Sequence, residues 1–528
     1  MHLNNNLIDD ITQVSRGRTV INAFANYGRY AASFVIHVFL QAYIIRTLGR
    51  NEYAIWPLVI TCIGFVGLIP LAVGSGAGRF LAHALGRKDL REVEQITTSL
   101  FAALLGAAVI YTVAVVLLSI YFERIFDIPE GAEGIGPWAM LLVGLSGTVA
   151  LPFGVFRGGL RAAQKFVVLN VMAVVFLVAR LILVILAFTL AVPSLICIAG
   201  INLALAMAED LAFYILAKRM VPWQRVRWSS FNLRVLKKVN NFSLLLLISH
   251  IGTLLYWQTD HIIINKLLDP SMLTGYSVVS NITLHCYRLT SLGISVLLPV
   301  ATILHAKGDL PRIARLVFRI NRSIVPFVLS LLFFLILHGA EILDIYIGAP
   351  YRRYATLFPI LGVAMMVSGI QNSAAIVPQA CGKWLTVSIM SFIVAFSNVL
   401  LSIYFVLGLG WGLEGVAAGT AIVTVIYKTC FWPWYTARFL KIRWREYVRE
   451  SILIPAYNSL PFIIISLVIY NLGLGRNLRE LIVAMTIAAG VQLAYMLLWG
   501  FDNKDRMVLR RLFLNPATKL RFLLSSRL

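Results

Sequence analysis

The chain has 528 residues, of which 59% are hydrophobic and 13% are charged, and its mean hydropathy is +0.84. Soluble domains carry about a quarter charged residues, so this composition excludes an ordinary soluble enzyme and predicts a membrane protein. The 46 Lys and Arg residues exceed the 23 Asp and Glu residues by 23, but a nucleic-acid-binding protein would explain only this charge and not the hydrophobicity.

Apolar runs follow one another along the whole chain, and most approach the ~20 residues that a helix needs to cross the hydrocarbon core. Because backbone polar groups must be satisfied within lipid, these uniform runs predict helices. The runs that we interpret as about 14 transmembrane helices are 19–45, 53–75, 99–121, 137–156, 166–190, 194–217, 242–265, 273–301, 324–347, 355–377, 385–407, 412–432, 452–471 and 478–499. The sequence therefore predicts an all-α polytopic membrane protein.

The connecting segments carry an asymmetric charge under this topology. An even number of spans places both termini on one side, where termini and alternate loops hold 35 Lys and Arg residues against 12 Asp and Glu residues. The loops of the other side hold 8 basic and 10 acidic residues. Basic residues favour the cytoplasm, so both termini are predicted to be cytoplasmic in a plasma (inner) membrane. Most of this charge orients the protein and attracts anionic headgroups, and no nucleic-acid partner is expected.

One cytoplasmic segment is predicted to form a short amphipathic helix on the membrane surface. It opens at residues 309–311 and places apolar and basic residues on opposite faces. The basic face holds Arg312, Arg315, Arg319 and Arg322. The tail beyond Asp502 alternates in a similar way.

Two parts of the chain resemble each other at an offset near 220 residues. Leu81-Ala82-His83-Ala84, followed by Gly86 and Asp89, corresponds to Ile303-Leu304-His305-Ala306, followed by Gly308 and Asp309. Tyr53 and Tyr276 also hold matching places after a short outer loop. This offset predicts two pseudo-symmetric six-helix bundles, as in many secondary transporters, plus two C-terminal helices. The expected parts are an N-terminal lobe (1–228), a C-terminal lobe (229–440), and two additional helices with a basic tail (441–528).

A polar stripe runs along the first predicted span. Its members are Asn22, Asn26, Arg29, Ser33, His37 and Gln41, and spacings of three or four residues place them on one helical face. Such a face cannot point into lipid, so it lines a water-filled cavity or joins a polar network between helices. Arg29 lies on the order of 16 Å into the run, too deep to reach the inner surface by snorkelling.

Three further arginines are candidate substrate-binding residues. Arg288 lies near the middle of the eighth run and shares a broad face with Asn281. Arg79 ends the second run, where it lines the cavity or serves as an anchor at the inner surface. Arg180 lies in the middle of the fifth run and faces the cavity or bonds another helix.

The acidic residues within the runs are fewer. Asp260 can bind Na⁺ or H⁺, or pair with an arginine such as Arg288. Glu209 and Asp210 lie about two turns from the cytoplasmic end of their run, where a salt bridge is favoured over ion coupling. No organic cofactor or ligated metal centre is predicted. Within the runs, Arg29, Arg180 and Arg288 outnumber the single aspartate, Asp260. This excess of positive charge favours an anionic substrate, and the planar guanidinium suits phosphate.

Several segments resemble the polysaccharide flippases, which act on lipid-linked oligosaccharides of the O-antigen type in lipopolysaccharide synthesis. This family belongs to the multidrug/oligosaccharidyl-lipid/polysaccharide exporter superfamily. The similar segments are Leu48-Gly49-Arg50-Asn51-Glu52-Tyr53, Arg79-Phe80-Leu81-Ala82, Pro152-Phe153 through Lys165-Phe166, Gly275-Tyr276, and Leu298-Pro299 through Asp309. The resemblance covers essentially the whole chain.

The resemblance implies a V-shaped pair of bundles around a central cavity, with alternating access. In the lipid II flippases of this superfamily, arginines in spans 1, 2 and 8 line the cavity, which implies that role for Arg29, Arg79 and Arg288. Those relatives also have fourteen spans, of which the last two form a groove for the lipid tail.

These observations predict a flippase, not an enzyme, that moves a polyprenyl-diphosphate-linked saccharide from the cytoplasmic to the outer leaflet. Expected partners are this substrate, membrane lipids, and polysaccharide polymerase or glycosyltransferase machinery. One alternative is a cation-coupled multidrug extruder of the same fold, in which acids should outnumber arginines in the cavity. Another is a membrane-embedded saccharide polymerase or glycosyltransferase, which needs a large outer loop or an acidic surface site. A scaffold protein would leave the polar stripe unexplained.

Overall fold

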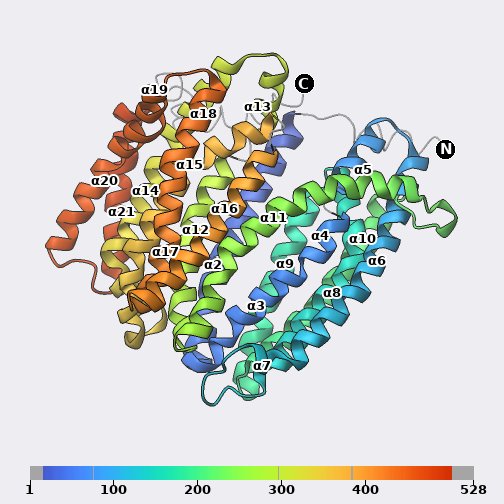
Figure 1. Cartoon of the computed structure of the whole chain (residues 1–528), viewed down its shortest axis with the longest axis horizontal. Helices are drawn as coiled ribbons and strands as arrows, with labels where there is room; N and C mark the ends of the chain where they lie inside the picture. Colours follow the sequence, from blue (N-terminus) through green and yellow to red (C-terminus); the bar gives the residue numbers. More distant parts are fainter. Residues whose placement is uncertain (1–15, 75–76, 295–296, 382–383, 502–528) are drawn as a thin grey trace. The chain divides into compact units, whose positions relative to one another are not determined.

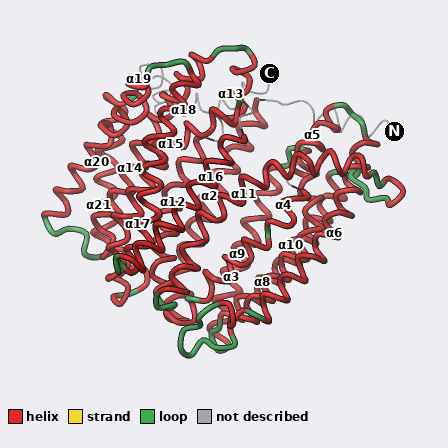
Figure 2. The backbone as a smooth tube through the Cα atoms, in the orientation of Figure 1, coloured by secondary structure: helices red, strands yellow, loops and turns green. Residues whose placement is uncertain are grey.

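The computed structural model describes residues 16–74, 77–294, 297–381 and 384–501, and all regular structure in these ranges is helical (Figures 1 and 2). The predicted all-α class is thereby confirmed. Twelve segments of the described residues are long and apolar enough to cross a membrane. They are Gly28–Tyr53, Ile55–Val73, Leu90–Ile120, Ile135–Ala162, Phe166–Leu190, Leu195–Met220, Leu310–Ile347, Ala349–Ala374, Leu385–Gly408, Gly412–Leu440, Trp444–Asn471 and Leu478–Gly500.

The sequence predicts fourteen spans, two more than these twelve. Of the two remaining runs, 242–265 lies in α11 (Leu233–Leu267), and 273–301 begins in α12 (Met272–Ile294) and extends past its end into α13 (Leu297–Ala306). Helices α11 and α12 have 35 and 23 residues. Both are therefore long enough to cross a bilayer. In α12, polar residues such as Asn281 and Arg288 interrupt the apolar sequence. The count of fourteen stays a prediction.

The chain divides into two compact units, one up to Leu254 and the other from Leu255 onward within the described residues. The border lies inside α11. The predicted lobe borders at 228/229 and 440/441 stay predictions, and each unit is described by itself below.

The helices of the first unit pack around α8, which contacts both α6 and α10 extensively. Small residues permit this close approach, since a Cβ at Gly144 or Gly147 would collide with the side chains of Val115 or Tyr111 on α6. The helices are α2 (Arg16–Tyr53), α3 (Ile55–Val66), α4 (Leu68–Gly74), α5 (Ala77–Gly86), α6 (Leu90–Ile120), α7 (Phe122–Ile125), α8 (Ile135–Ala162), α9 (Phe166–Leu190), α10 (Leu195–Met220), the 3₁₀ turn η1 (Trp228–Ser230) and the first part of α11.

In the second unit α14 is the longest helix, with 38 residues and a kink at His338, and it packs against α15 and α20. The elements after α12 are α13 (Leu297–Ala306), α14 (Leu310–Ile347), η2 (Ala349–Thr356), α15 (Leu357–Ala380), α16 (Trp384–Ile403), η3 (Tyr404–Gly408), α17 (Gly412–Ile426), η4 (Tyr427–Phe431), α18 (Trp432–Leu440), α19 (Trp444–Val448), η5 (Arg449–Leu453), α20 (Ile454–Asn471), α21 (Leu478–Tyr495) and η6 (Met496–Gly500).

The short amphipathic helix predicted from residue 309 onward is not a separate element. Its residues form the first turns of α14, which continues to Ile347 with the kink at His338. The basic face is therefore attached to a transmembrane helix. The similar stretch beyond Asp502 lies outside the described residues.

The turn between α5 and α6 recurs between α13 and α14, 220 residues later. Asp89 and Asp309 cap the following helices, each accepting a hydrogen bond from the backbone three residues ahead. The backbone N–H of Asp89 bonds the carbonyl of Ala84 at 3.0 Å, and that of Asp309 bonds the carbonyl of Leu304 at 3.0 Å. The residue before each cap, Lys88 or Gly308, has a positive φ. The sequence similarity thus corresponds to the same local structure in both units.

Candidate functional site

The polar stripe of α2 has both bonded and exposed members. The Asn170 side chain of α9 donates a 2.7 Å hydrogen bond to Asn26, and Gln41 donates a 3.0 Å bond to the hydroxyl of Tyr53. His37 is exposed, and its Nδ1 lies 2.6 Å from the Ser33 carbonyl one turn earlier. The stripe thus combines a network between helices with a polar surface. The Asn22 side chain lies outside the described residues.

Arg29 is the only cation of that stripe. Its side chain is exposed, and no hydrogen-bond or ion-pair partner lies near it in the described part of the chain. In the second unit, Arg288 on α12 is likewise exposed and has no carboxylate within ion-pair distance among the described residues. Asn281, on the same helix, is half-buried. Both guanidinium groups therefore keep hydrogen-bond donors for an anion.

The two other predicted arginines differ from these. Arg180 on α9 is half-buried, and its Nε is buried without a hydrogen-bond partner in the described structure. Its nearest charge partner is Glu209, with which it interacts electrostatically. Arg79 belongs to α5, but its side chain lies outside the described residues.

An ion-pair network joins α8 and α10 in the first unit. Arg157 of α8 forms an ion pair and a hydrogen bond with Asp210, and its guanidinium lies 3.8 Å from Glu209. The guanidinium carbon also stacks 4.8 Å from the centre of the Phe213 ring. Asp210 is 1% exposed, so Arg157 compensates a carboxylate that is removed from water.

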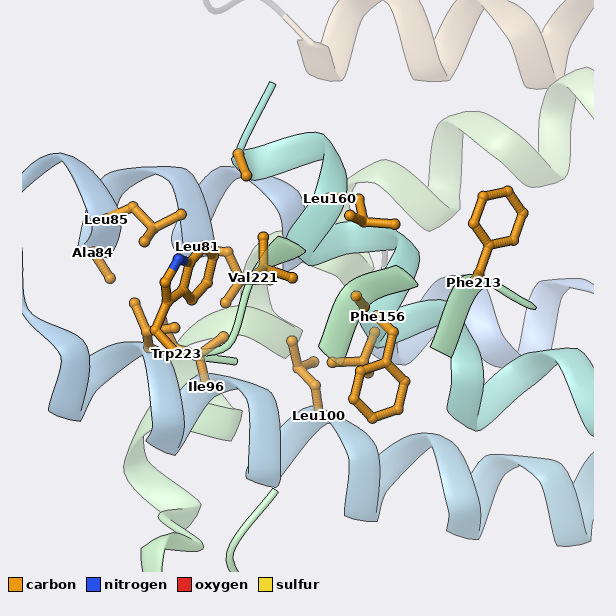
Figure 3. Packing of buried hydrophobic residues seen from close by; sticks show 14 of the residues in the cluster. Leu81, Ala84, Leu85, Ile96, Leu100, Phe156, Leu160, Phe213, Val221 and Trp223 are labelled. Carbon is orange, nitrogen blue, oxygen red and sulfur yellow. The ribbon is translucent and has the colours of Figure 1, made fainter. Parts of the chain in front are cut away.

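A hydrophobic cluster positions this network. Figure 3 shows Leu100 of α6, Phe156 and Leu160 of α8, and Phe213 of α10 among its buried side chains. Phe156 directly precedes Arg157 in α8. The cluster therefore fixes α8 against α10 at the level where Arg157 meets Asp210.

Asp260 lies at the centre of a different cluster, in the second unit. Its carboxylate is 6% exposed and accepts hydrogen bonds from Tyr276 of α12 at 2.5 Å and Thr420 of α17 at 2.9 Å. The Asn398 amide of α16 is 3.4 Å from the other carboxylate oxygen. Four helices, α11, α12, α16 and α17, thus converge on one carboxylate, and the contacts described for it are with neutral groups.

The cluster contains more hydrogen-bond acceptors than Thr420 can serve. Its single hydroxyl proton has two acceptors in reach, Asp260 at 2.9 Å and the Asn398 carbonyl oxygen at 3.0 Å. The Ser402 hydroxyl similarly lies 3.2 Å from that amide oxygen and 3.3 Å from the Val416 carbonyl. This oxygen-rich arrangement around one carboxylate is suited to a proton or a small hard cation.

A glycine allows the helices to approach closely enough for these contacts. A Cβ at Gly419 would lie 2.7 Å from the backbone nitrogen and 2.9 Å from the Cα of Ser402, a separation that real side chains do not adopt. Gly419 therefore brings α17 against α16 and places the adjacent Thr420 beside Asn398. Ser402 and Asn398 are fully buried.

The acids of these clusters stand out in the sequence as charged residues within apolar runs, but most of their partners do not. The predicted run 137–156 ends one residue before Arg157, whereas α8 continues to Ala162 and carries Arg157 inside the helix. Asn398 and Thr420 lie 138 and 160 residues from Asp260. A signal was available only for Tyr276, which matches Tyr53 in the repeat.

With this geometry established, comparison with known proteins places the chain in a family. Residues 44–356, more than half of the sequence, match the family described as "Polysaccharide biosynthesis protein". The chain belongs to this family. It is thus a multi-pass membrane protein of the polysaccharide biosynthesis family, which confirms the resemblance seen in the sequence.

One curated relative and two solved structures illustrate the similarity of this polysaccharide biosynthesis family member. It is 22% identical to the uncharacterized membrane protein EpsK of Bacillus subtilis (strain 168), over 79% of this chain and 83% of that protein. Its fold resembles the lipid II flippase MurJ in an inward closed conformation, with a TM-score of 0.66, 15% identity, and coverage of 90% and 98% of the two chains. It also resembles an inward-facing MATE family transporter of the MOP superfamily, with a TM-score of 0.61, 15% identity, and coverage of 82% and 98%. The fold is therefore that of the MurJ and MATE proteins.

Proposed function

We propose that this protein is a flippase that moves a polyprenyl-diphosphate-linked saccharide from the cytoplasmic to the outer leaflet by alternating access. The observation that carries the proposal is the pair of exposed guanidinium groups, Arg29 on α2 and Arg288 on α12. A cation inside a membrane protein is costly and normally has a counter-charge. In the proposal a diphosphate headgroup supplies that charge to each guanidinium group considered by itself, through the bidentate bonds that a planar guanidinium forms with phosphate.

The family and the fold support this substrate class. Membership of the polysaccharide biosynthesis family points to a saccharide, and the likeness to MurJ points to one carried on a lipid. Saccharides of the O-antigen type, which partner glycosyltransferases or polymerases would assemble, fit this description. In the proposal Arg79 and the α2 stripe line the path of the headgroup, while the polyprenyl tail stays in lipid.

The proposed topology has fourteen spans, arranged as two six-helix bundles and a C-terminal pair. Both termini lie on the cytoplasmic side of the inner membrane. The support is the charge distribution, 35 basic against 12 acidic residues on one side. The recurrence of the capped turn in both units supports the two-bundle arrangement.

In the proposal, a cation bound at Asp260 drives the cycle. Na⁺ or H⁺ neutralises the carboxylate and is bound among the oxygen atoms of Asp260, Thr420 and Asn398. Asn398 and Thr420 come from α16 and α17, so binding there changes the packing of these helices against α11. That change couples the ion gradient to movement of the headgroup.

The test is transport of a labelled polyprenyl-diphosphate saccharide by the purified protein in vesicles. Arg29→Ala and Arg288→Ala should each lower flipping about tenfold or more, because a lost hydrogen bond to a charged group weakens binding by ~1.5–3 kcal/mol. Arg234→Ala, at an exposed arginine of α11, is the matched control and should leave flipping unchanged. Normal flipping by both variants would exclude the proposed phosphate site.

The same vesicles separate the flippase from the multidrug extruder. A cationic drug should neither compete with the lipid-linked saccharide nor move in response to an ion gradient. Competition by the drug at equal concentration would favour the extruder instead.

A further inference from the structure

A basic segment without any acidic residue connects α10 to α11 in the first unit. Residues 218–232 contain no Asp or Glu and four basic residues, Lys218, Arg219, Arg225 and Arg227. All four side chains are exposed. Among the described residues, the one carboxylate within ion-pair distance of these four is Glu94 of α6, which lies 3.8 Å from the Arg227 guanidinium. The segment therefore carries an excess of positive charge.

Hydrogen bonds hold the linker, residues 221–232, against α6. The backbone N–H of Arg227 donates to the Thr98 hydroxyl at 3.1 Å, and that of Asn232 donates to the Ser99 hydroxyl at 2.9 Å. Trp223 is buried in the hydrophobic cluster that Figure 3 shows. Packing and hydrogen bonds thus fix the orientation of the linker, although only the short η1 is helical in it.

The fixed linker nevertheless presents large aromatic side chains at its surface. Trp228 is 62% exposed, and Phe231 is also exposed. Only five positions separate Trp228 from the buried Trp223, so one end of the linker is anchored in the core while the other faces outward. Contact of such side chains with water is unfavourable, and an apolar environment would remove that cost.

The linker meets α6 where the sequence of this helix becomes apolar. With 31 residues α6 is ~46 Å long, more than the ~30 Å of the hydrocarbon core. Residues 91–95 are mostly charged or amide residues, and the apolar run begins near Ser99. Because Asn232 bonds Ser99, the linker lies at the level where hydrocarbon gives way to headgroups.

Trp228 also lies on the side of α6 that faces lipid. Its ring packs edge to face on Phe101, with 6.3 Å between the ring centroids. Phe101 is followed at spacings of four residues by Leu105 and Val109, which are both exposed. Residues four apart share one helix face, so the exposed apolar row of α6 continues through Phe101 to Trp228. Tryptophan prefers this depth in membrane proteins.

We propose that the linker is a docking site for the anionic surface of the surrounding membrane. Trp228 and Phe231 insert among the headgroups, and Arg225 and Arg227 bind the phosphates of anionic glycerophospholipids such as phosphatidylglycerol. Basic residues beside a membrane helix attract such lipids, and apolar side chains bury themselves in the same layer. The site anchors the first unit where α10 ends and α11 begins. It does not depend on the proposed flippase activity.

The test uses the full-length protein in vesicles of phosphatidylcholine and phosphatidylglycerol whose acyl chains carry bromine, which quenches tryptophan emission. The difference between the wild type and Trp228→Phe isolates the emission of Trp228. Bromine near the glycerol should quench this emission more strongly than bromine near the chain ends, and aqueous acrylamide should quench it weakly. Strong quenching by acrylamide and none by either lipid would overturn the proposal, because it would leave this surface to water or to a protein partner.

Exchange of the headgroup tests the basic residues. Trp228 emission should be quenched preferentially by brominated phosphatidylglycerol over brominated phosphatidylcholine. Arg225→Gln/Arg227→Gln should lower this preference roughly thirtyfold, as expected for two basic residues near an anionic surface. The control Arg91→Gln/Arg161→Gln removes the same charge from exposed positions of α6 and α8 and should retain the preference. An equal loss in this control would indicate general surface attraction and overturn the site.

A last measurement distinguishes the sources of phosphate. Inorganic phosphate, added at constant ionic strength, should leave the preference for phosphatidylglycerol unchanged. Its loss would assign the two arginines to a free anion, and the lipid site would then be wrong.

Discussion

The two units place a polar side chain at the same point of the repeat, but with different chemistry. In the first unit Gln41 donates to the hydroxyl of Tyr53, and in the second the hydroxyl of Tyr276 donates to Asp260. The two tyrosines hold matching places in the sequence repeat. An amide in one unit thus corresponds to a carboxylate in the other.

The fifth and eleventh predicted spans extend the contrast. Arg180 and Asn398 hold equivalent positions in their helices. Each follows the first residue of its helix, Phe166 of α9 or Trp384 of α16, by the same number of residues. In the second unit the position supplies a neutral amide whose NH₂ group donates to the carboxylate, and in the first it supplies a cation. The repeat therefore sets where polar groups lie, while the residue type decides whether they can hold a positive ion.

The acids of the first unit are also compensated differently. Asp210 pairs with Arg157, whereas the described contacts of Asp260 are with neutral hydroxyl and amide groups. A compensated pair holds two helices together, and an uncompensated carboxylate among oxygen atoms attracts a cation. The comparison predicts that charge removal affects stability in the first unit and ion coupling in the second.

The largest effect is expected for Arg157→Ala. It leaves the buried carboxylate of Asp210 without its cation, which should lower the free energy of unfolding by about 3 kcal/mol. Thermal unfolding in detergent measures this change, with Arg161→Ala at an exposed position of the same helix as the control. Asp210→Asn combined with Arg157→Ala should restore part of the loss. Equal melting temperatures for Arg157→Ala and Arg161→Ala would contradict a structural ion pair.

Asp260→Asn should have the next largest effect, on coupling. The amide has nearly the same shape and can still accept from Tyr276, so the fold is retained, but the cluster loses its only negative charge. We expect the affinity for the coupling ion, Na⁺ or H⁺, to fall about 100-fold, which is the upper end of the loss in affinity seen at altered metal sites. Flipping in vesicles with and without each ion gradient measures this. Unchanged gradient dependence together with normal flipping would show that the ion binds elsewhere.

The sequence predicted helices well because hydropathy and charge asymmetry act over whole segments. It also identified Asp260, since an isolated acid in an apolar run is conspicuous. It could not identify Asn398 or Thr420, because neutral polar residues are common in membrane helices and their meeting depends on packing at Gly419. Arg157 was missed for a local reason. Gly158 and Gly159 beside it indicate a loop, although packing keeps this stretch helical.

Gln41→Leu has the smallest expected effect, and it tests directly whether Gln41 in the first unit and Asp260 in the second have different functions. Tyr53 is 5% exposed, so the loss of the Gln41 hydrogen bond should cost about 1 kcal/mol of stability. Gradient dependence should stay unchanged, because the first unit has Arg180 where the second has Asn398. Thermal unfolding and gradient-driven flipping of the same preparation measure both quantities. If Gln41→Leu abolished gradient dependence as Asp260→Asn does, the two positions would be equivalent in function, and the difference in charge between the units would not explain where the cation binds.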